Sequence, residues 1–439
     1  MRTDRPRTAV RAFAVFLLFT LLAGDFWRNT ISWGGWIALA LALAVVSGIL
    51  LVRLRPSIPW SRLPWTLGLF LAWATVSLIW SDYRGASVLG ILGQYATTLA
   101  ALFLALCLSW EELLRALGHA LRWIIGLSIL FELVVSVIIR HEIVPLWTNY
   151  GPRKIPQAFY WSRDLLFHGG QIQGIQGNSN LLAMIALLGL IVFSIELGNR
   201  SVRQVTGIVW IVLAVATFAL TRSSTIFAAT AFTIVVALFA LWMRASRPER
   251  RLPIYGAMLA VGILGVLAIW RLQGPILHLL DKSDSLTGRT GIWGAVIHLA
   301  QERPVTGWGW VSYWAPWVPL FQHLAVRKGV TYLQAHDAWL DVWMQLGIIG
   351  LVIFILLVAT TLWRSWFAAI DRPRTRVEGP ERFTALTLLP LLVMAALVAQ
   401  SAAESRILIE GGWALLVVMS VKTKAERFSA VSDPVPSRY

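Results

Sequence analysis

A histidine directly before a long apolar run has the residue type and the setting that suit proton transfer. His336 lies in the segment Gln-Ala-His-Asp directly before a long apolar run. A neutral imidazole there can take a proton from a sugar hydroxyl, although a histidine at a membrane boundary can also be purely structural. Glu404 lies in the segment Ala-Glu-Ser-Arg between the last two apolar runs, where it either orients the histidine or the arginines or caps a helix. His336 is therefore the candidate proton acceptor, and for Glu404 the helix cap is the favoured of these alternatives.

Two arginines predict a site that binds an anion, and a third is a further candidate. Arg222 lies in a very short turn, Thr-Arg-Ser-Ser, where its guanidinium would sit level with headgroup phosphates or would fix helix depth by snorkelling. Arg289 is flanked by two glycines ahead of a helix-like pattern, which predicts backbone N–H groups and a bidentate cation at one point, or a simple turn and cap. Arg163, in a basic and aromatic segment at 140–174, is a further candidate ligand. Two arginines and one histidine on one side of a membrane suit an anionic lipid substrate and a hydroxyl acceptor.

The composition predicts the kind of protein that must position these residues. Hydrophobic residues make up 57% of the 439 residues and charged residues 14%, and the mean hydropathy is +0.69. Soluble, disordered, collagen-like and disulfide-scaffold classes are thereby excluded. The net charge of +16 reflects orientation in the membrane and does not predict a nucleic-acid partner. Cys107 is the single cysteine, so no intramolecular disulfide and no Cys-x-x-Cys pair can form.

Apolar runs long enough to cross a bilayer predict about twelve transmembrane helices. The first run, which follows four arginines, has no Ala-x-Ala site and is expected to remain as an uncleaved helix. The expected fold is therefore an all-α integral membrane protein. The runs are 10–24, 31–52, 63–80, 86–108, 121–139, 175–197, 205–220, 223–243, 252–271, 339–363, 385–401 and 407–421.

The distribution of basic residues predicts the orientation of these helices. Arginine and lysine gather in every short connection on one side, which places that side and both termini in the cytoplasm. Two long segments, 140–174 and 272–338, then lie outside, and loops of that length are usually functional. We divide the chain into spans one to nine (1–271), a large helical outer loop (272–338), and spans ten to twelve with a cytoplasmic tail (339–439).

One motif resembles a known family. His336-Asp337, followed after nine residues by Gly347-Ile348-Ile349-Gly350, resembles the signature of the O-antigen ligase family. The Ser285–Arg289 segment with Trp293 and the Thr221–Ser223 turn resemble other landmarks of the wider ligase and polymerase superfamily. Twelve spans with a large loop before the motif helix also fit, so the resemblance covers most of the chain. The family usually has Asn, Ser or Gln after the histidine, whereas this chain has Asp337.

The resemblance implies a reaction on the periplasmic face of a bacterial inner membrane. Its donor would be O-antigen polysaccharide on undecaprenyl diphosphate, and its acceptor the lipid A–core oligosaccharide, with membrane lipids around both. Transfer would invert the sugar and need neither metal nor other cofactor. His336 would be the general base, Arg222 and Arg289 would bind the diphosphate, and Arg163 and Glu404 would be further binding residues.

Three other functions remain open. An O-antigen polymerase would use the same donor with a second lipid-linked glycan as acceptor. A metal-dependent glycosyltransferase would use an acidic residue in the first outer loop, near which Asp25 lies. A lipid-linked glycan transporter would place ionisable groups near the midplane, where Glu132 is the candidate.

Overall fold

The computed structural model describes residues 4–56, 60–151, 155–279, 283–327, 330–371, 374–375, 379–380 and 383–425. Helices dominate this part of the chain. The α-helices are α1 (Asp4–Leu22), α2 (Gly24–Leu54), α3 (Trp65–Val76), α4 (Arg84–Cys107), α5 (Trp110–Val134), α6 (Ser179–Gly198), α7 (Gln204–Thr221), α8 (Ser224–Ala245), α9 (Arg251–Leu279), α10 (Ser283–Glu302), α11 (Pro319–Gln322), α12 (Ala338–Ile370), α13 (Leu389–Ser401) and α14 (Glu410–Ala425).

The strands among the described residues are short and form two antiparallel pairs. Strand β1 (Val326–Arg327) pairs with β2 (Val330–Thr331), and β3 (Arg374–Thr375) pairs with β4 (Gly379–Pro380). Each strand has two residues, so neither pair is a layer of the fold. The predicted all-α class is confirmed.

Seven described helices are long and apolar enough to cross a membrane. Two shorter apolar helices, Trp65–Ile79 and Ala385–Ser401, match other predicted runs. The chain is therefore a multi-pass membrane protein, and the count of twelve spans stays a prediction. The seven are Gly24–Leu54, Arg84–Cys107, Trp110–Ile139, Ser179–Gly198, Gln204–Thr221, Ser224–Ala245 and Ala338–Ile370.

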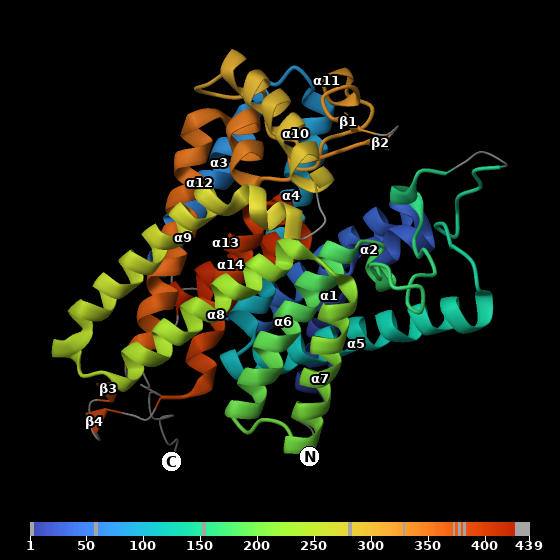
Figure 1. Ribbon diagram of the computed structural model, residues 1–439. Coiled ribbons are helices and arrows are strands. Elements are labelled where there is room, and N and C mark those ends of the chain that lie inside the picture. Colours follow the sequence, from blue (N-terminus) through green and yellow to red (C-terminus); the bar gives the residue numbers. More distant parts are fainter. Residues whose placement is uncertain are drawn as a thin grey trace.

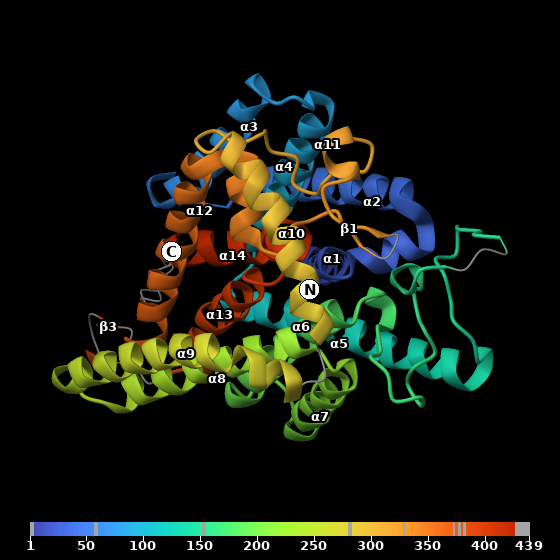
Figure 2. The ribbon, with the colours of Figure 1, turned by 45° about the horizontal axis from the view of Figure 1, so that its top comes forward.

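The helices place the predicted outer loop at one end of the molecule. Helices α10 and α11 and the β1–β2 pair lie together there, beside α3, α4 and the start of α12 (Figures 1 and 2). The turns that join α6 to α7 and α8 to α9 lie toward the opposite end (Figure 1). Which side of the membrane each end faces stays a prediction.

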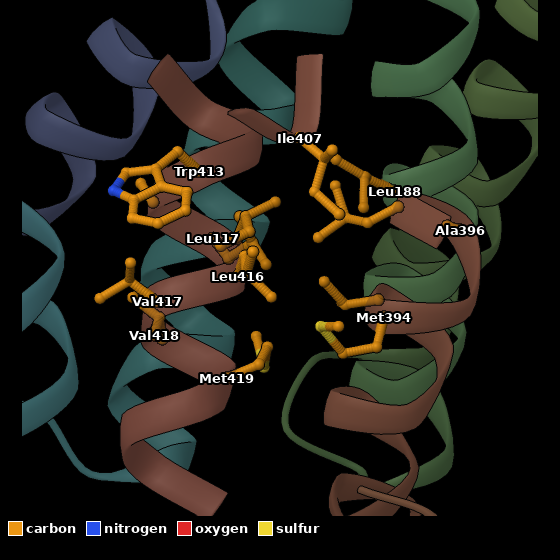
Figure 3. Close-up of a cluster of buried hydrophobic side chains, with 14 of the residues drawn as sticks. Leu117, Leu188, Met394, Ala396, Ile407, Trp413, Leu416, Val417, Val418 and Met419 are labelled. Carbon is orange, nitrogen blue, oxygen red and sulfur yellow. The ribbon is translucent and has the colours of Figure 1, made fainter. Parts of the chain in front are cut away.

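The core that holds this end in place is apolar and centres on α14. Leu416 of α14 is fully buried, and Leu117, Leu188 and Met394 lie on its side of the helix, on α5, α6 and α13 (Figure 3). Trp413, also fully buried, points to the other side, where it packs on Phe70. Because lipid surrounds the outer helices, close packing of such side chains is what fixes the relative positions of the inner ones.

Gly347 interrupts α12 and lets the chain before it pack against the helix. Its φ of 67° is left-handed, and a Cβ there would lie 2.1 Å from the carbonyl oxygen of Val305. The break frees backbone groups that bond to the segment 304–309: Trp308 N–H donates to the Met344 carbonyl at 3.0 Å, and Ile348 N–H to that of Pro304 at 2.8 Å. Glycine in the sequence motif is thus explained by a close backbone approach.

The segment after α5 folds back into the molecule and is anchored by Glu132. This carboxylate, 1% exposed, accepts hydrogen bonds from the backbone N–H of Gln173 at 3.0 Å and of Gly174 at 2.7 Å, and from the Ser162 hydroxyl at 3.0 Å. The residue that the transporter hypothesis relied on therefore fixes a loop. That loop ends where α6 begins, next to the turn that carries Arg222.

Candidate functional site

His336 occupies a strained position directly before α12. Its φ is 52°, a left-handed conformation that a non-glycine residue adopts only when its surroundings hold it. Asp337 caps α12, accepting the backbone N–H groups of Trp339 at 2.9 Å and Leu340 at 3.0 Å. Burial raises the pKa of Asp337, and these two hydrogen bonds partly oppose the rise. Asp337 is thus engaged with the helix end, and another carboxylate meets His336.

That carboxylate is Glu404, in the connection between α13 and α14. Its Oε2 lies 2.9 Å from His336 Nδ1, and its side chain is 4% exposed. A carboxylate oxygen only accepts, so Nδ1 carries the proton and Nε2 is left to receive one. The alternative that Glu404 orients the histidine agrees with this contact.

Three further donors surround Glu404. Arg289 Nη2 lies 3.1 Å from Oε1, Asn180 Nδ2 lies 3.2 Å from the same oxygen, and Gln334 Nε2 lies 3.1 Å from Oε2. Burial would raise the pKa of Glu404, but attraction to His336, its hydrogen bond, and the guanidinium groups of Arg289 and Arg406 outweigh burial and hold the pKa at about 2. Glu404 is therefore an anion throughout the physiological pH range.

Arg289 comes to this cluster from a helix, which differs from the sequence prediction. We expected it in a glycine-flanked turn ahead of a helix, but α10 already begins at Ser283 and Arg289 lies within it. Two glycines weaken a helix without ending it. The expected convergence of free backbone N–H groups at Arg289 is therefore wrong. Its guanidinium instead bonds Glu404 and, at 3.2 Å, the Thr225 hydroxyl.

Arg222 lies on the turn between α7 and α8, whose neighbouring residues contact the cluster. It is exposed, has a left-handed φ of 48°, and ends α7. The next residue, Ser223, caps α8 and donates to Asn180 Oδ1 at 2.7 Å. Thr225 accepts from Arg289, as described above. The turn that carries Arg222 is thereby linked to Glu404 through Asn180 and through Arg289.

Arg163 belongs to the loop behind this turn. Its guanidinium donates to Gln173 Oε1 at 3.1 Å and to the Gln171 carbonyl at 3.4 Å, and Gln171 in turn donates to the Arg222 carbonyl at 3.4 Å. Burial lowers the pKa of Arg163, partly offset by nearby glutamates. Within the described residues no direct contact joins Arg163 to Glu404 or Arg289, so its contribution to ligand binding stays a prediction.

A network of four charges supports the Glu404 connection from the other side. Arg406 donates to Asp25 at 3.1 Å and to Glu410 at 3.3 Å, and Arg28 bonds the same two carboxylates. Asp25 is thus held between two arginines. Opposite charges are balanced within the network, which lets it pack against the apolar wall of the bundle.

Sequence reasoning missed Asn180, which joins the Arg222 turn to Glu404. Its segment, Gly-Asn-Ser-Asn, has the composition of a helix start, and Asn178 does cap α6 by accepting the N–H groups of Asn180 and Leu181. That local role masks the second one, since no pattern along the chain shows that the Asn180 side chain meets a residue 224 positions later.

Comparison with known proteins finds a family match over part of the chain. Residues 207–355 match the family model described as O-antigen ligase. Over this part of its length the chain is similar to the O-antigen ligase family. Arg222, Arg289 and His336 lie within the matched segment, whereas Glu404 and Arg163 lie outside it.

One curated relative is similar over part of the chain. The exopolysaccharide production protein ExoQ of Rhizobium meliloti (strain 1021) is 25% identical over 187 residues, which cover 40% of this chain and 41% of the relative. The chain thus aligns with less than half of that protein. Members of the O-antigen ligase family are membrane enzymes that transfer glycans, as ligases or as polymerases.

Proposed function

We propose that this protein is a ligase that transfers a glycan from a lipid-linked diphosphate to a hydroxyl of a second glycolipid on the periplasmic side of the inner membrane. The observation that carries the proposal is the contact of His336 with Glu404, which is itself bonded to Arg289. A proton acceptor and a cation for phosphate meet at one buried carboxylate. That combination suits glycosyl transfer to a hydroxyl group.

The proposed chemistry assigns one role to each residue. His336 Nε2 takes the proton of the acceptor hydroxyl while the hydroxyl oxygen attacks the anomeric carbon of the donor glycan. Glu404 fixes the imidazole by accepting from Nδ1 and stabilises the imidazolium that forms. The bond between the anomeric carbon and the diphosphate oxygen breaks, and the electron pair leaves with the lipid diphosphate. Attack from the opposite face inverts the anomeric centre.

The arginines act on the leaving group. We propose that Arg222, which is exposed on its turn, and Arg289, which is paired with Glu404, bind the anionic diphosphate beside the histidine. Guanidinium groups stabilise the charge that grows on the diphosphate as it departs. Among the described residues no group of three or more His, Cys, Asp or Glu side chains could hold a metal ion. We propose metal-independent transfer, for which activity in EDTA is the test.

The substrates follow from the family resemblance. We propose undecaprenyl-diphosphate-linked O-antigen as donor and the outer core of lipid A–core as acceptor. The experiment is to delete the gene and examine the lipopolysaccharide. Loss of a ligase leaves the core without long chains while lipid-linked polymer accumulates. A core that carries a single repeat would instead identify the protein as a polymerase.

The relative from Rhizobium favours a second candidate function. Its name refers to exopolysaccharide production, so this chain could extend a polysaccharide on the same type of lipid-linked donor. In that case the deletion strain loses secreted polysaccharide and its lipopolysaccharide pattern is unchanged. The chemistry at His336 would be the same, with the terminal hydroxyl of a second lipid-linked glycan as acceptor.

A further inference from the structure

Asp341, one turn into α12, is a buried carboxylate that accepts four hydrogen bonds. It is 1% exposed. Its Oδ1 accepts from Trp314 Nε1 at 2.7 Å and from Gln345 Nε2 at 3.3 Å. Its Oδ2 accepts from the backbone N–H of Ala335 at 3.1 Å and from the hydroxyl of Ser405. All four donors come from protein groups, so this anion is fully satisfied without solvent.

The two donors on Oδ2 have a specific relation to the site. Ala335 directly precedes His336, and Ser405 directly follows Glu404. A single oxygen atom therefore holds the neighbours of both partners in the histidine–carboxylate contact. His336 and Glu404 lie 68 positions apart in the chain, and their side chains are 2.9 Å apart. That distance requires the two connecting segments to keep a fixed position relative to each other.

The other oxygen fixes the longer segment that leads to His336. Trp314 is fully buried and lies in the chain between α10 and α12. Gln345 accepts the backbone N–H groups of Val311 at 2.8 Å and Ser312 at 3.0 Å while donating to Asp341. Helix α12 thus provides a rigid support for Asp341, whose carboxylate fixes the irregular segments on both sides of the site.

We propose that Asp341 is a positioning residue that sets the separation of His336 and Glu404. Its catalytic consequence rests on the proposed function, whereas its structural consequence does not. Within the described residues Asp341 makes no hydrogen bond to His336 or Glu404 themselves. It acts through Ala335 and Ser405, and its removal leaves the general base present but displaced.

The decisive variant is Asp341→Asn, which keeps the size of the side chain. An amide has one acceptor oxygen and an NH₂ group that only donates. In either orientation, two of the four groups that donate to Asp341 would therefore face the NH₂ group and lose their acceptor. We expect kcat to fall about a hundredfold, because a displacement near 1 Å at a reacting group costs about that much. The KM for the lipid-linked donor should stay within about twofold, since Arg222 and Arg289 lie outside this network.

Two serines provide a milder test and its control. Ser405→Ala removes only the hydroxyl that donates to Asp341. Ser401→Ala, on α13, removes a comparable buried contact, because Ser401 accepts from Trp339 Nε1 at 3.1 Å without touching Asp341. Ser405→Ala should lower kcat and Ser401→Ala should not. The double variant Asp341→Asn with Ser405→Ala should lower kcat by less than the product of the two single reductions, since both substitutions remove the same hydrogen bond.

A cross-link measures the geometry without activity. In a Cys107→Ser background, His336→Cys and Glu404→Cys are joined by a short bifunctional thiol reagent in the full-length protein. We expect efficient cross-linking with Asp341 and a clearly lower yield with Asp341→Asn. If cross-linking depends on Asp341 while the wild-type protein transfers no glycan, the positioning role stands and the proposed function fails. Unchanged yield and unchanged kcat in Asp341→Asn would overturn the proposal, as would equal effects of the two serine variants.

Discussion

Replacement of Glu404 by glutamine tests the site at its most connected residue. The substitution keeps the shape of the side chain and removes its charge. His336, Arg289, Gln334 and Asn180 all donate to this carboxylate. A glutamine has one acceptor oxygen for these four donors, and its NH₂ group would face other N–H groups. The imidazole would lose the partner that selects its tautomer.

The effect on stability follows from the pKa of Glu404. Burial opposes ionisation, but His336, Arg289 and Arg406 hold the pKa at about 2, against an ordinary value of 4.5. A depression of that size corresponds to about 3 kcal/mol of folding free energy. Because the folded-state pKa is the lower one, this contribution is present above pH 4.5 and is lost as the pH falls toward 2. At pH 7, Glu404→Gln should therefore lower the free energy of unfolding by about 3 kcal/mol.

Two assays measure the consequences. Thermal unfolding in detergent should show a lower midpoint for the variant at pH 7 and a shrinking difference as the pH falls through the range below 4.5. Transfer of lipid-linked glycan by the folded fraction should show kcat reduced about a hundredfold or more, the usual contribution of a well-placed general base. Glu196→Gln is the matched control, since Glu196 is equally buried but pairs with Arg122, away from the site.

One pattern of results would show that Glu404 does not have the proposed role. If Glu404→Gln keeps kcat within about twofold of the wild type while Glu196→Gln behaves the same way, Glu404 does not orient the base. A stability difference that is independent of pH would show that the carboxylate is not held as an anion by its neighbours.

The remaining predictions concern the neighbours of this residue and the helix that carries the motif. Arg289→Gln should raise the KM for the lipid-linked donor tenfold to about a hundredfold, because a charge-assisted hydrogen bond to phosphate is lost, and Arg289→Lys should restore part of it; donor titrations measure this. Asn180→Asp should lower kcat about tenfold at pH 7 by placing a second negative charge beside Glu404, and an unchanged kcat would remove Asn180 from the site. Gly347→Ala should lower stability by about 2 kcal/mol or more, since alanine strains the left-handed backbone and its Cβ meets the Val305 carbonyl; an unaltered thermal midpoint would contradict the close approach.

Much of the fold could be predicted from the sequence because apolar runs have few alternatives in a membrane. Every predicted run corresponds to a described helix, with shifts at the ends. Helix α5 begins at Trp110, before the predicted start, because Ser109 and Glu112 form a capping box there. Helix α2 begins at Gly24 and is interrupted at Ser32, where φ is 68°. Hydrophobicity locates a helix, but its ends depend on polar side chains.

The site was only partly accessible to such reasoning. His336, Glu404 and Arg289 could be chosen by residue type and by their place beside the membrane, and the structure brings these three together. The carboxylate that contacts His336 is Glu404, whereas Asp337, the next residue in the chain, caps α12. Spacing along the chain could not show which of the two carboxylates contacts the histidine. Asn180 and Asp341 were missed for a common reason: each acts through contacts between segments that only the folded bundle brings together.

The most direct test of the central proposal is transfer by the purified protein in EDTA, with undecaprenyl-diphosphate-linked glycan as donor and lipid A–core as acceptor. The measurement compares the wild type with His336→Ala, with donor binding followed separately. We expect ligated product from the wild type, none from the variant, and nearly equal donor binding by both. Normal ligation by His336→Ala would contradict the assignment of the base, and no product from the wild type in any lipid-linked assay would contradict the enzyme.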